Sequence, residues 1–206
     1  MQKLLRIDSS ARTTESHSRK LGDHFQNLWQ RKFPEGQIVC RDLAAKPIDH
    51  ITQSTIEGFY TPPEVQSEPV RHSLEVSNQL IEELKDSHTL LLTVPIYNFS
   101  VPSSLKAWID QIVRINHTFS FDGKDFNGLM RTDNAVVICT YGASGYLKGE
   151  PFDQANYLQP YLEFLLQFLG IGKVDFVSLQ STTADIETVN KNTSEARLRI
   201  QALLAN

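Results

Sequence analysis

The chain has 206 residues, of which 40% are hydrophobic and 21% charged, a composition typical of one folded domain and not of a disordered or fibrous chain. Its net charge of −4 argues against a nucleic-acid partner, which would select an excess of Lys and Arg. The two cysteines, Cys40 and Cys139, are too few for a disulfide framework and favour the reducing cytoplasm. The longest apolar run, near residues 90–96, is too short for a membrane span. We therefore expect a single cytoplasmic domain over residues 1–206, with neither a nucleic acid nor a membrane as partner.

The first seventy residues predict two strands, one helix and a long loop. Apolar runs at 4–7 and 38–40 predict strands, and the apolar spacing over 21–29 predicts a helix between them. The charges of Arg41 and Asp42 are typical of an edge strand. Residues 43–70 are expected to be mostly loop, because prolines interrupt them. These prolines are Pro47, Pro62, Pro63 and Pro69.

The rest of the chain alternates helices with buried strands. A helix is expected over 71–86, before the apolar strand 89–94. Pro102 suits the first turn of the next helix, and Asp122-Gly123 predicts a small hairpin within 117–127. The remaining expected elements are a strand at 135–139, a helix at 157–169 ended by Gly170, a strand at 174–179 and a last helix from Asp185.

Five strands alternating with helices predict an α/β fold with a parallel sheet, in the order 2-1-3-4-5, covered by helices on both faces. Such sheets bind ligands beyond the carboxyl ends of their strands, where the strand order reverses. The loops that follow residues 8, 94 and 139 should therefore meet at one edge and form the site.

The first of these loops, SSARTTESHS at 9–18, is rich in hydroxyl groups and leads into a helix. Hydroxyls and the free N–H groups of a helix N-terminus can hold an anion such as a phosphate. Equally, one of these serines could be a simple N-cap. The glycine patterns of dinucleotide and nucleoside-triphosphate loops are absent.

One of the other two loops offers aromatic side chains on which a planar ring could rest, and the other offers backbone that could approach a ligand closely. PIYNFSVP at 95–102 carries Tyr97 and Phe99, against which a planar ring could lie, or which could instead cap the core. TYGASG at 140–145 contains Gly142, which lets backbone approach a ligand. It does not spell the GxSxG elbow of a serine hydrolase, because Tyr146 stands two residues after Ser144.

The serine-rich opening and the string PIYNFSVPSSLKAWID resemble the FMN-dependent NADH azoreductases and quinone oxidoreductases of bacteria, and the resemblance runs the length of the chain. It implies a flavodoxin-like three-layer sandwich, FMN as cofactor, NADH as electron donor, quinones and azo compounds as substrates, and a homodimer. No catalytic residue is implied, because the flavin carries the chemistry.

The resemblance also implies which residues contact FMN. The phosphate is expected at Ser10, Ser16, His17 and Ser18. The ring is expected along Ile96, Tyr97, Asn98 and Phe99, with the segment Thr140, Tyr141, Gly142 and Ala143 closing over it. Family members more often carry a Ser-Arg-Gly-Gly run in that last segment, so Tyr141 and Ala143 are expected to change what lies above the ring and hence the substrate range.

Several aromatic residues keep two interpretations. Phe119, Phe121 and Phe126 could line a substrate pocket or merely pack the hairpin, and Phe59 and Tyr60 could reach a second subunit or pack locally. The six scattered histidines do not predict a metal site, and both cysteines are expected to be inert core thiols.

Two rival functions are weighed against the oxidoreductase. A flavodoxin-type electron carrier is disfavoured because such carriers tend to be strongly acidic, whereas −4 over 206 residues is mild. A serine hydrolase using Ser144 is disfavoured because the segment does not match the GxSxG motif and because no histidine follows His117 in the sequence.

Overall fold

The computed structural model describes residues 1–205 and contains a parallel five-stranded sheet in the order β2-β1-β3-β6-β7. With β4 and β5 set apart as an antiparallel hairpin, this is the predicted 2-1-3-4-5 arrangement. The strands are β1 (Lys3–Asp8), β2 (Gln37–Asp42), β3 (Thr89–Pro95), β4 (Phe119–Phe121), β5 (Phe126–Gly128), β6 (Asn134–Thr140) and β7 (Lys173–Leu179).

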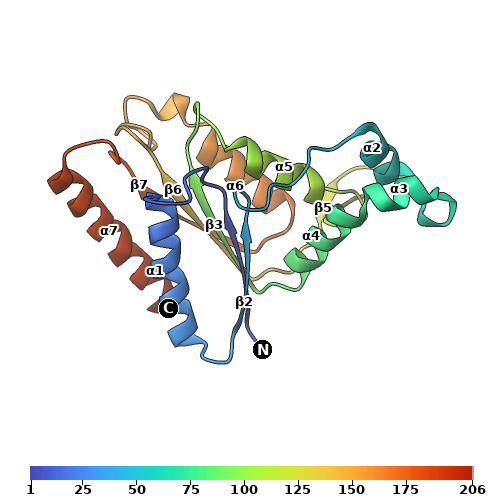
Figure 1. Cartoon of the computed structure of the whole chain (residues 1–206), viewed down its shortest axis with the longest axis horizontal. Helices are drawn as coiled ribbons and strands as arrows, with labels where there is room; N and C mark the ends of the chain where they lie inside the picture. The colour runs from blue at the N-terminus through green and yellow to red at the C-terminus, as the bar shows by residue number, and fades with distance from the viewer. Residues whose placement is uncertain (206) are drawn as a thin grey trace.

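Helices cover both faces of the sheet, so that the molecule has three layers (Figure 1). One face is covered by α1 (His17–Lys32) and α7 (Ile186–Ala205), and the other by α4 (Glu75–Lys85), α5 (Ser103–Ile112) and α6 (Leu158–Phe168). Alternation along each strand explains the two cores: Leu4 lies in the α1–α7 core, whereas its neighbour Leu5 lies in the other. Both are 1% exposed.

Close packing brings α1 onto the sheet at Gly22. A Cβ at this position would lie 2.6 Å from Cγ2 of Thr93 and 3.1 Å from a guanidinium nitrogen of Arg6. A larger residue would force the helix outward, and with it the loop that precedes the helix. Gly22 therefore helps to set the height of the first predicted loop above the sheet.

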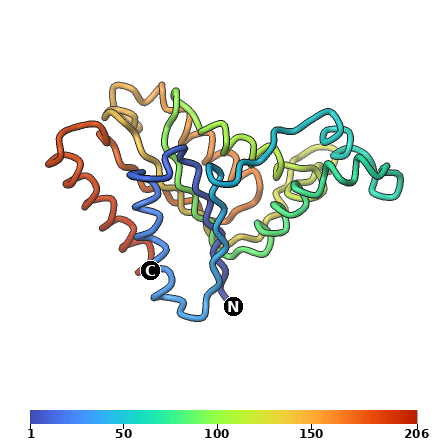
Figure 2. The backbone as a smooth tube through the Cα atoms, in the orientation of Figure 1, coloured from blue at the N-terminus to red at the C-terminus, as the bar shows by residue number. Residues whose placement is uncertain are grey.

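The prediction that residues 43–70 are mostly loop is wrong. This segment contains α2 (Gln53–Tyr60), a 3-10 turn η1 (Pro63–Val65) and the start of α3 (Glu68–Ser73), which extend away from the sheet as an arm (Figure 2). Pro62, Pro63 and Pro69 lie in or just before first helical turns, where proline is tolerated because the missing N–H would have no partner there. Pro47 lies in irregular backbone before α2. A capping box between Thr52 and Thr55 begins α2.

Two further sequence expectations need correction. The helix expected over 71–86 is interrupted at Leu74, which separates α3 from α4 and packs its buried side chain against Gly58 of α2. Cys40 is exposed and not a core thiol, because it lies on the edge strand β2. Cys139 is buried, and burial raises the pKa of its thiol to about 12, which keeps it protonated and unreactive.

Candidate functional site

The three predicted loops lie side by side at the carboxyl edge of the sheet. The N–H of Ala11 donates to the hydroxyl oxygen of Tyr97 at 3.3 Å, which joins the first loop to the second. The N–H of Ile96 donates to the carbonyl of Thr140 at 2.9 Å, which joins the second to the third. Segments far apart in the chain therefore form one continuous rim, as the strand order requires.

The start of α1 gathers buried hydroxyl groups. Ser10, Ser16 and Ser18 are 2%, 5% and 1% exposed, and the hydroxyls of Ser16 and Ser18 lie 3.2 Å apart. Ser16 is the N-cap of α1, but its oxygen accepts from the Arg19 N–H at a long 3.5 Å. The first turn carries no acidic residue, so the positive end of the helix dipole is not neutralised there. These features suit an anion.

His17 adds a donor to the same turn. The side chain is half-buried, and burial, with Lys20 and Arg12 nearby, lowers the pKa of its imidazole below 6.5. The ring is therefore neutral at pH 7, and it can donate one hydrogen bond to an anion while accepting another.

The aromatic segment is a tight turn with an unusual backbone. Tyr97 and Ser100 exchange both backbone hydrogen bonds, at 3.0 and 3.1 Å, and the two residues between them, Asn98 and Phe99, have φ values of 47° and 73°. Two successive positive φ angles are typical of a type I′ turn, a conformation that an aromatic residue rarely adopts and that recurs at functional sites. The turn leaves Tyr97 and Phe99 37% and 52% exposed, so both rings are available to a ligand.

The third loop is fixed by backbone hydrogen bonds from the segment that follows β7. The carbonyls of Tyr141, Gly142 and Ala143 accept hydrogen bonds from the backbone of residues 181–183, and the Thr183 hydroxyl also donates to the Gly142 carbonyl at 2.9 Å. Within residues 1–205 no hydrogen bond occupies the N–H groups of Gly142 or Ala143. The loop can therefore present amide donors to a ligand.

The side chain of Tyr141 does not lie above the site, contrary to the sequence expectation. It is fully buried, its hydroxyl oxygen accepts from the side-chain amide of Asn156 at 3.2 Å, and its ring stacks on Tyr146 at 5.3 Å. Burial raises the pKa of this phenol, which stays protonated. An aromatic residue here is absorbed by the core between the sheet and α6, so only the backbone of Tyr141 faces the rim.

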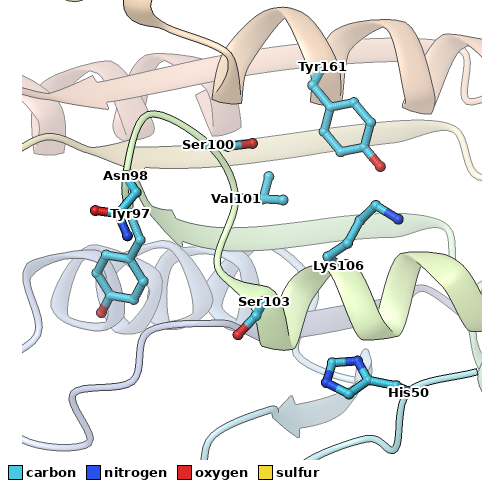
Figure 3. A pocket seen from close by; sticks show the side chains of 8 residues that line it. All are labelled: His50, Tyr97, Asn98, Ser100, Val101, Ser103, Lys106 and Tyr161. Carbon is cyan, nitrogen blue, oxygen red and sulfur yellow. The ribbon is translucent and has the colours of Figure 1, made fainter.

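A cavity of about 610 Å³ adjoins the aromatic segment (Figure 3). It is lined by His50, Tyr97, Asn98, Ser100, Val101, Ser103, Lys106 and Tyr161. In Figure 3 the Lys106 and Tyr161 side chains lie on one side of the 97–101 turn, while the Tyr97 ring lies on the other. The sequence treats Lys106 only as part of a charged helix face with Asp110, with which it does form an ion pair. Nothing in the sequence indicates that it also lines a cavity.

A buried charge network beneath the first loop was also missed. Arg6 is 4% exposed within β1 and donates to Asp8, Asp23 and Gln26. Arg19, on the first turn of α1, donates to both carboxylate oxygens of Asp42. The available signal was a charge at the centre of the apolar run KLLRI, which a buried strand accommodates only with partners.

The aromatics considered for a substrate pocket are not near the rim in this chain. The hairpin follows α5 and packs against the end of α6: Phe119 lies 4.9 Å from Phe168, and Gly128 touches Gly170. This is the amino-terminal end of the sheet, opposite the three loops. Phe59, on the arm, lies under the guanidinium of Arg114 at 5.1 Å, and Tyr60 is 77% exposed.

The structure contradicts the hydrolase alternative. After Ser144 the chain enters a loop and not a helix, and Glu150 holds this loop by accepting from the Leu147 N–H and the Gln180 side chain. Within residues 1–205, no histidine forms a hydrogen bond with Ser144. In the same range, no group of three or more His, Cys, Asp or Glu side chains is placed to bind a metal ion. No helix among these residues is long and apolar enough to cross a membrane.

Comparison with known proteins agrees with the fold. A family model described as the flavodoxin-like fold matches residues 2–204. The chain is 44% identical over 175 residues to an FMN-dependent NADH:quinone oxidoreductase of Xanthobacter autotrophicus, covering 85% of this chain and 84% of that one. It is 36% identical to a protein of the same name from Hydrogenovibrio crunogenus, over 99% of this chain and 100% of that one.

Solved structures share the same architecture. An azoreductase from Bacillus anthracis superposes with a TM-score of 0.90 at 16% identity, over 99% of each chain. An FMN-dependent NADH-azoreductase from Bacillus anthracis, in complex with FMN, superposes with a TM-score of 0.87 at 23% identity, over 99% of this chain and 100% of that one. From its fold, its full-length match and the identity to these relatives, we conclude that the chain belongs to the flavodoxin-like family of FMN-dependent NADH:quinone oxidoreductases.

Proposed function

We propose that this protein is an FMN-dependent NADH:quinone oxidoreductase that also cleaves azo compounds. The observation that carries the proposal is the meeting of three loops at one rim, through Ala11 to Tyr97 and Ile96 to Thr140. Together they offer an anion cradle, exposed aromatic rings and backbone donors, which are the three features that a flat, phosphorylated cofactor requires. The relatives named above support the choice of FMN.

The residues present fit FMN at both of its ends. The buried hydroxyls of Ser10, Ser16 and Ser18 and the neutral imidazole of His17 would hold the phosphate at the start of α1. The turn at 96–99 would support the ring, with the 140–143 backbone closing over it. When bound, FMN would supply two-electron chemistry, with NADH as hydride donor and a quinone or azo compound as acceptor.

The protein's own part in this reaction is to bind, orient and stabilise. The type I′ turn fixes the N–H groups of Asn98 and Phe99, and the bonds to residues 181–183 fix those of Gly142 and Ala143. Preorganised amides of this kind stabilise negative charge at a ring edge without having to reorient. In this proposal the flavin carries the chemistry, and no side chain is assigned a catalytic role.

The order of events follows from a shared binding surface. NADH and the acceptor would use the same exposed face in turn, so that NAD⁺ leaves before the acceptor enters. One NADH and one proton convert a quinone to a hydroquinone. An azo compound needs two NADH and two protons to give two amines. We therefore expect ping-pong kinetics, with parallel lines in double-reciprocal plots, whereas intersecting lines would contradict this order.

The proposal can be tested directly on the purified protein, by its bound flavin and its NADH oxidation. Purified protein should be yellow, release FMN on denaturation and oxidise NADH when menadione is supplied. The flavodoxin-type carrier would also be yellow, but it would not be reduced by NADH without a partner reductase. A colourless protein that does not bind added FMN would contradict the proposal.

We further propose that the protein is a cytoplasmic homodimer. Phe121, Phe126 and Phe164 are 47%, 60% and 67% exposed and belong to one chain of ring contacts through Phe168. An exposed aromatic cluster of this kind is typical of an interface. A second subunit could bring such aromatics, or the arm that carries Phe59 and Tyr60, to the rim. Light scattering after size exclusion should give twice the chain mass of 23.4 kDa, and a monomeric mass would contradict the dimer.

A further inference from the structure

Arg19 is bound on three sides. Its two terminal nitrogens donate to the carboxylate of Asp42 at 2.6 and 2.7 Å, one of them also donates to the carbonyl of Ser10 at 2.9 Å, and Asp8 lies 3.7 Å away. Its side chain is 12% exposed. The hydrogen bonds from Arg19 lower the pKa of Asp42 to about 2, so the carboxylate stays charged over the working pH range. The charge of Arg19 is therefore neutralised, and its terminal nitrogens are occupied by the protein.

The bond to Ser10 fixes one peptide group. The C=O and N–H of a trans peptide point to opposite sides of the chain. Because the Ser10 carbonyl points to Arg19, the N–H of the next residue, Ala11, points the other way, where it meets the hydroxyl of Tyr97 at 3.3 Å. The Ser10–Ala11 peptide thus joins the anion cradle to the aromatic turn.

The rest of the loop is held below this peptide. The Ser9 hydroxyl donates to the Thr93 carbonyl at 2.8 Å, and the Thr93 hydroxyl donates to Asp8 at 2.7 Å. Asp8 also accepts from Arg6. These contacts fix residue 9 to the sheet, but they do not set the rotation of the peptide that follows residue 10. Among residues 1–205, the Arg19 bond is the only hydrogen bond to the Ser10 carbonyl, and it sets this rotation from the inner side.

We infer that Arg19, held by Asp42, is a positioning residue that orients the Ser10–Ala11 peptide and so sets the phosphate cradle in register with the Tyr97 ring. The inference rests on the proposed FMN function and deepens it. Arg19 would act on FMN through the loop and not by direct contact with the phosphate. Neither the sequence motifs nor the family resemblance identifies this role.

The first test compares Arg19→Lys with a matched control. Lysine keeps the charge but cannot form the two-pronged pair with Asp42 while also reaching Ser10. FMN affinity, measured on the apoprotein by quenching of flavin fluorescence, should weaken about tenfold, the usual effect of losing one hydrogen bond to a charged group. Riboflavin, which lacks the phosphate, should lose much less affinity. Asp42→Asn should act in the same direction as Arg19→Lys.

The control is Arg41→Lys. Arg41 forms a two-pronged pair with Glu83 from the neighbouring position on β2 and has no contact with the rim. This variant should lose a similar ion pair without any change in FMN affinity. Thermal unfolding of both variants will show whether each is folded and how much stability it has lost.

A double-mutant cycle tests the link through the peptide. Tyr97→Phe removes the acceptor of the Ala11 N–H. If Arg19 and Tyr97 act on the same peptide, their effects should not add. The FMN dissociation constant of the double variant should then lie within about threefold of that of the weaker-binding single variant. Additive losses would overturn the inference, because they would mean that the two residues act independently.

The two possible failures are distinguishable. Wild-type protein that does not bind FMN would overturn the proposed function and the inference together. Wild-type protein that binds FMN, alongside a folded Arg19→Lys variant that binds it as tightly, would overturn the inference alone. An equal loss of FMN and riboflavin in Arg19→Lys would also overturn it, since that result indicates a general loosening of the loop.

Discussion

Ser16 and Ser18 show how one residue type can have two roles within a single helical turn. Ser16 is the N-cap of α1, whereas Ser18 lies inside the helix, 1% exposed and without a capping bond of its own. Its hydroxyl has only the Ser16 hydroxyl as a hydrogen-bond partner among residues 1–205. A buried hydroxyl that caps nothing is therefore better explained by a ligand than by helix stability.

Replacement of these serines by alanine separates the two roles. Ser18→Ala should weaken FMN binding about tenfold with little change in the free energy of unfolding. Ser16→Ala should weaken binding and also lower the free energy of unfolding by about 1 kcal/mol, the usual effect of losing a cap. Fluorescence titration and urea unfolding of the apoprotein measure the two effects. Ser194→Ala, on an exposed position of α7, is the control, and a Ser18→Ala variant that loses stability but not FMN would make this serine purely structural.

At the scale of elements, the position of the hairpin depends on one close contact. A Cβ on Gly128 would lie 2.2 Å from the backbone nitrogen of Gly170 and 2.3 Å from the carbonyl carbon of Leu169. These are backbone atoms at the end of α6 and cannot move aside as a flexible side chain could. The N–H of Met130 donates to the Leu169 carbonyl at 2.9 Å just beyond the hairpin.

Gly128→Ala should therefore displace the hairpin from α6. We expect a loss of about 1–3 kcal/mol in the free energy of unfolding, the usual effect of overpacking, and faster proteolysis within 117–128. Within one subunit the hairpin lies at the opposite end of the sheet from the rim, so any change in FMN affinity would have to come from the hairpin of a second subunit. Ser120→Ala on β4 is the control. Unchanged stability in Gly128→Ala would mean that this contact relaxes without cost.

The arm of α2 and α3 illustrates why element prediction fails where prolines cluster. Pro63 and Pro69 lie in the first turns of η1 and α3, where the sequence pattern of a helix start and that of a loop are the same. Short helices carry little periodic signal, so the packing of Leu74 against Gly58 decides the outcome. That contact joins residues 16 positions apart and is not visible in local pattern.

At the scale of the whole molecule, stability should depend on pH through its partly buried histidines. Burial is the first cause of a lowered pKa at His17, His24 and His117. A histidine whose pKa is lower in the folded state binds more protons when unfolded, so stability falls as pH falls through about 6.5. Asp42 adds a second loss, because its pKa is about 2 in the folded protein against 3.8 when free.

The apoprotein should therefore have its highest melting temperature above pH 7, a first decline between about pH 7 and 5.5, and a second decline below about pH 4. Melting temperatures in matched buffers will test this. His24→Gln, away from the rim on the face of α1 near Arg197, should reduce the first decline. Asp42→Asn should reduce the second. A melting temperature that is constant from pH 7.5 to 5.5 would contradict the assignment to histidines.

The sequence alone determined the sheet, its strand order and the edge at which the site forms, because buried parallel strands have a continuous apolar signal and their topology limits where loops can meet. It also identified the three loops that meet there. Only the tertiary structure decided that the Tyr141 side chain turns into the core, that the Cys40 thiol is exposed, and that Arg19 bridges Asp42 and Ser10. Each of these depends on which neighbours a side chain meets across the fold. Local periodicity carries no information about such neighbours, since they lie outside the element itself. Asn156 is 15 residues from Tyr141, and Asp42 is 23 residues from Arg19.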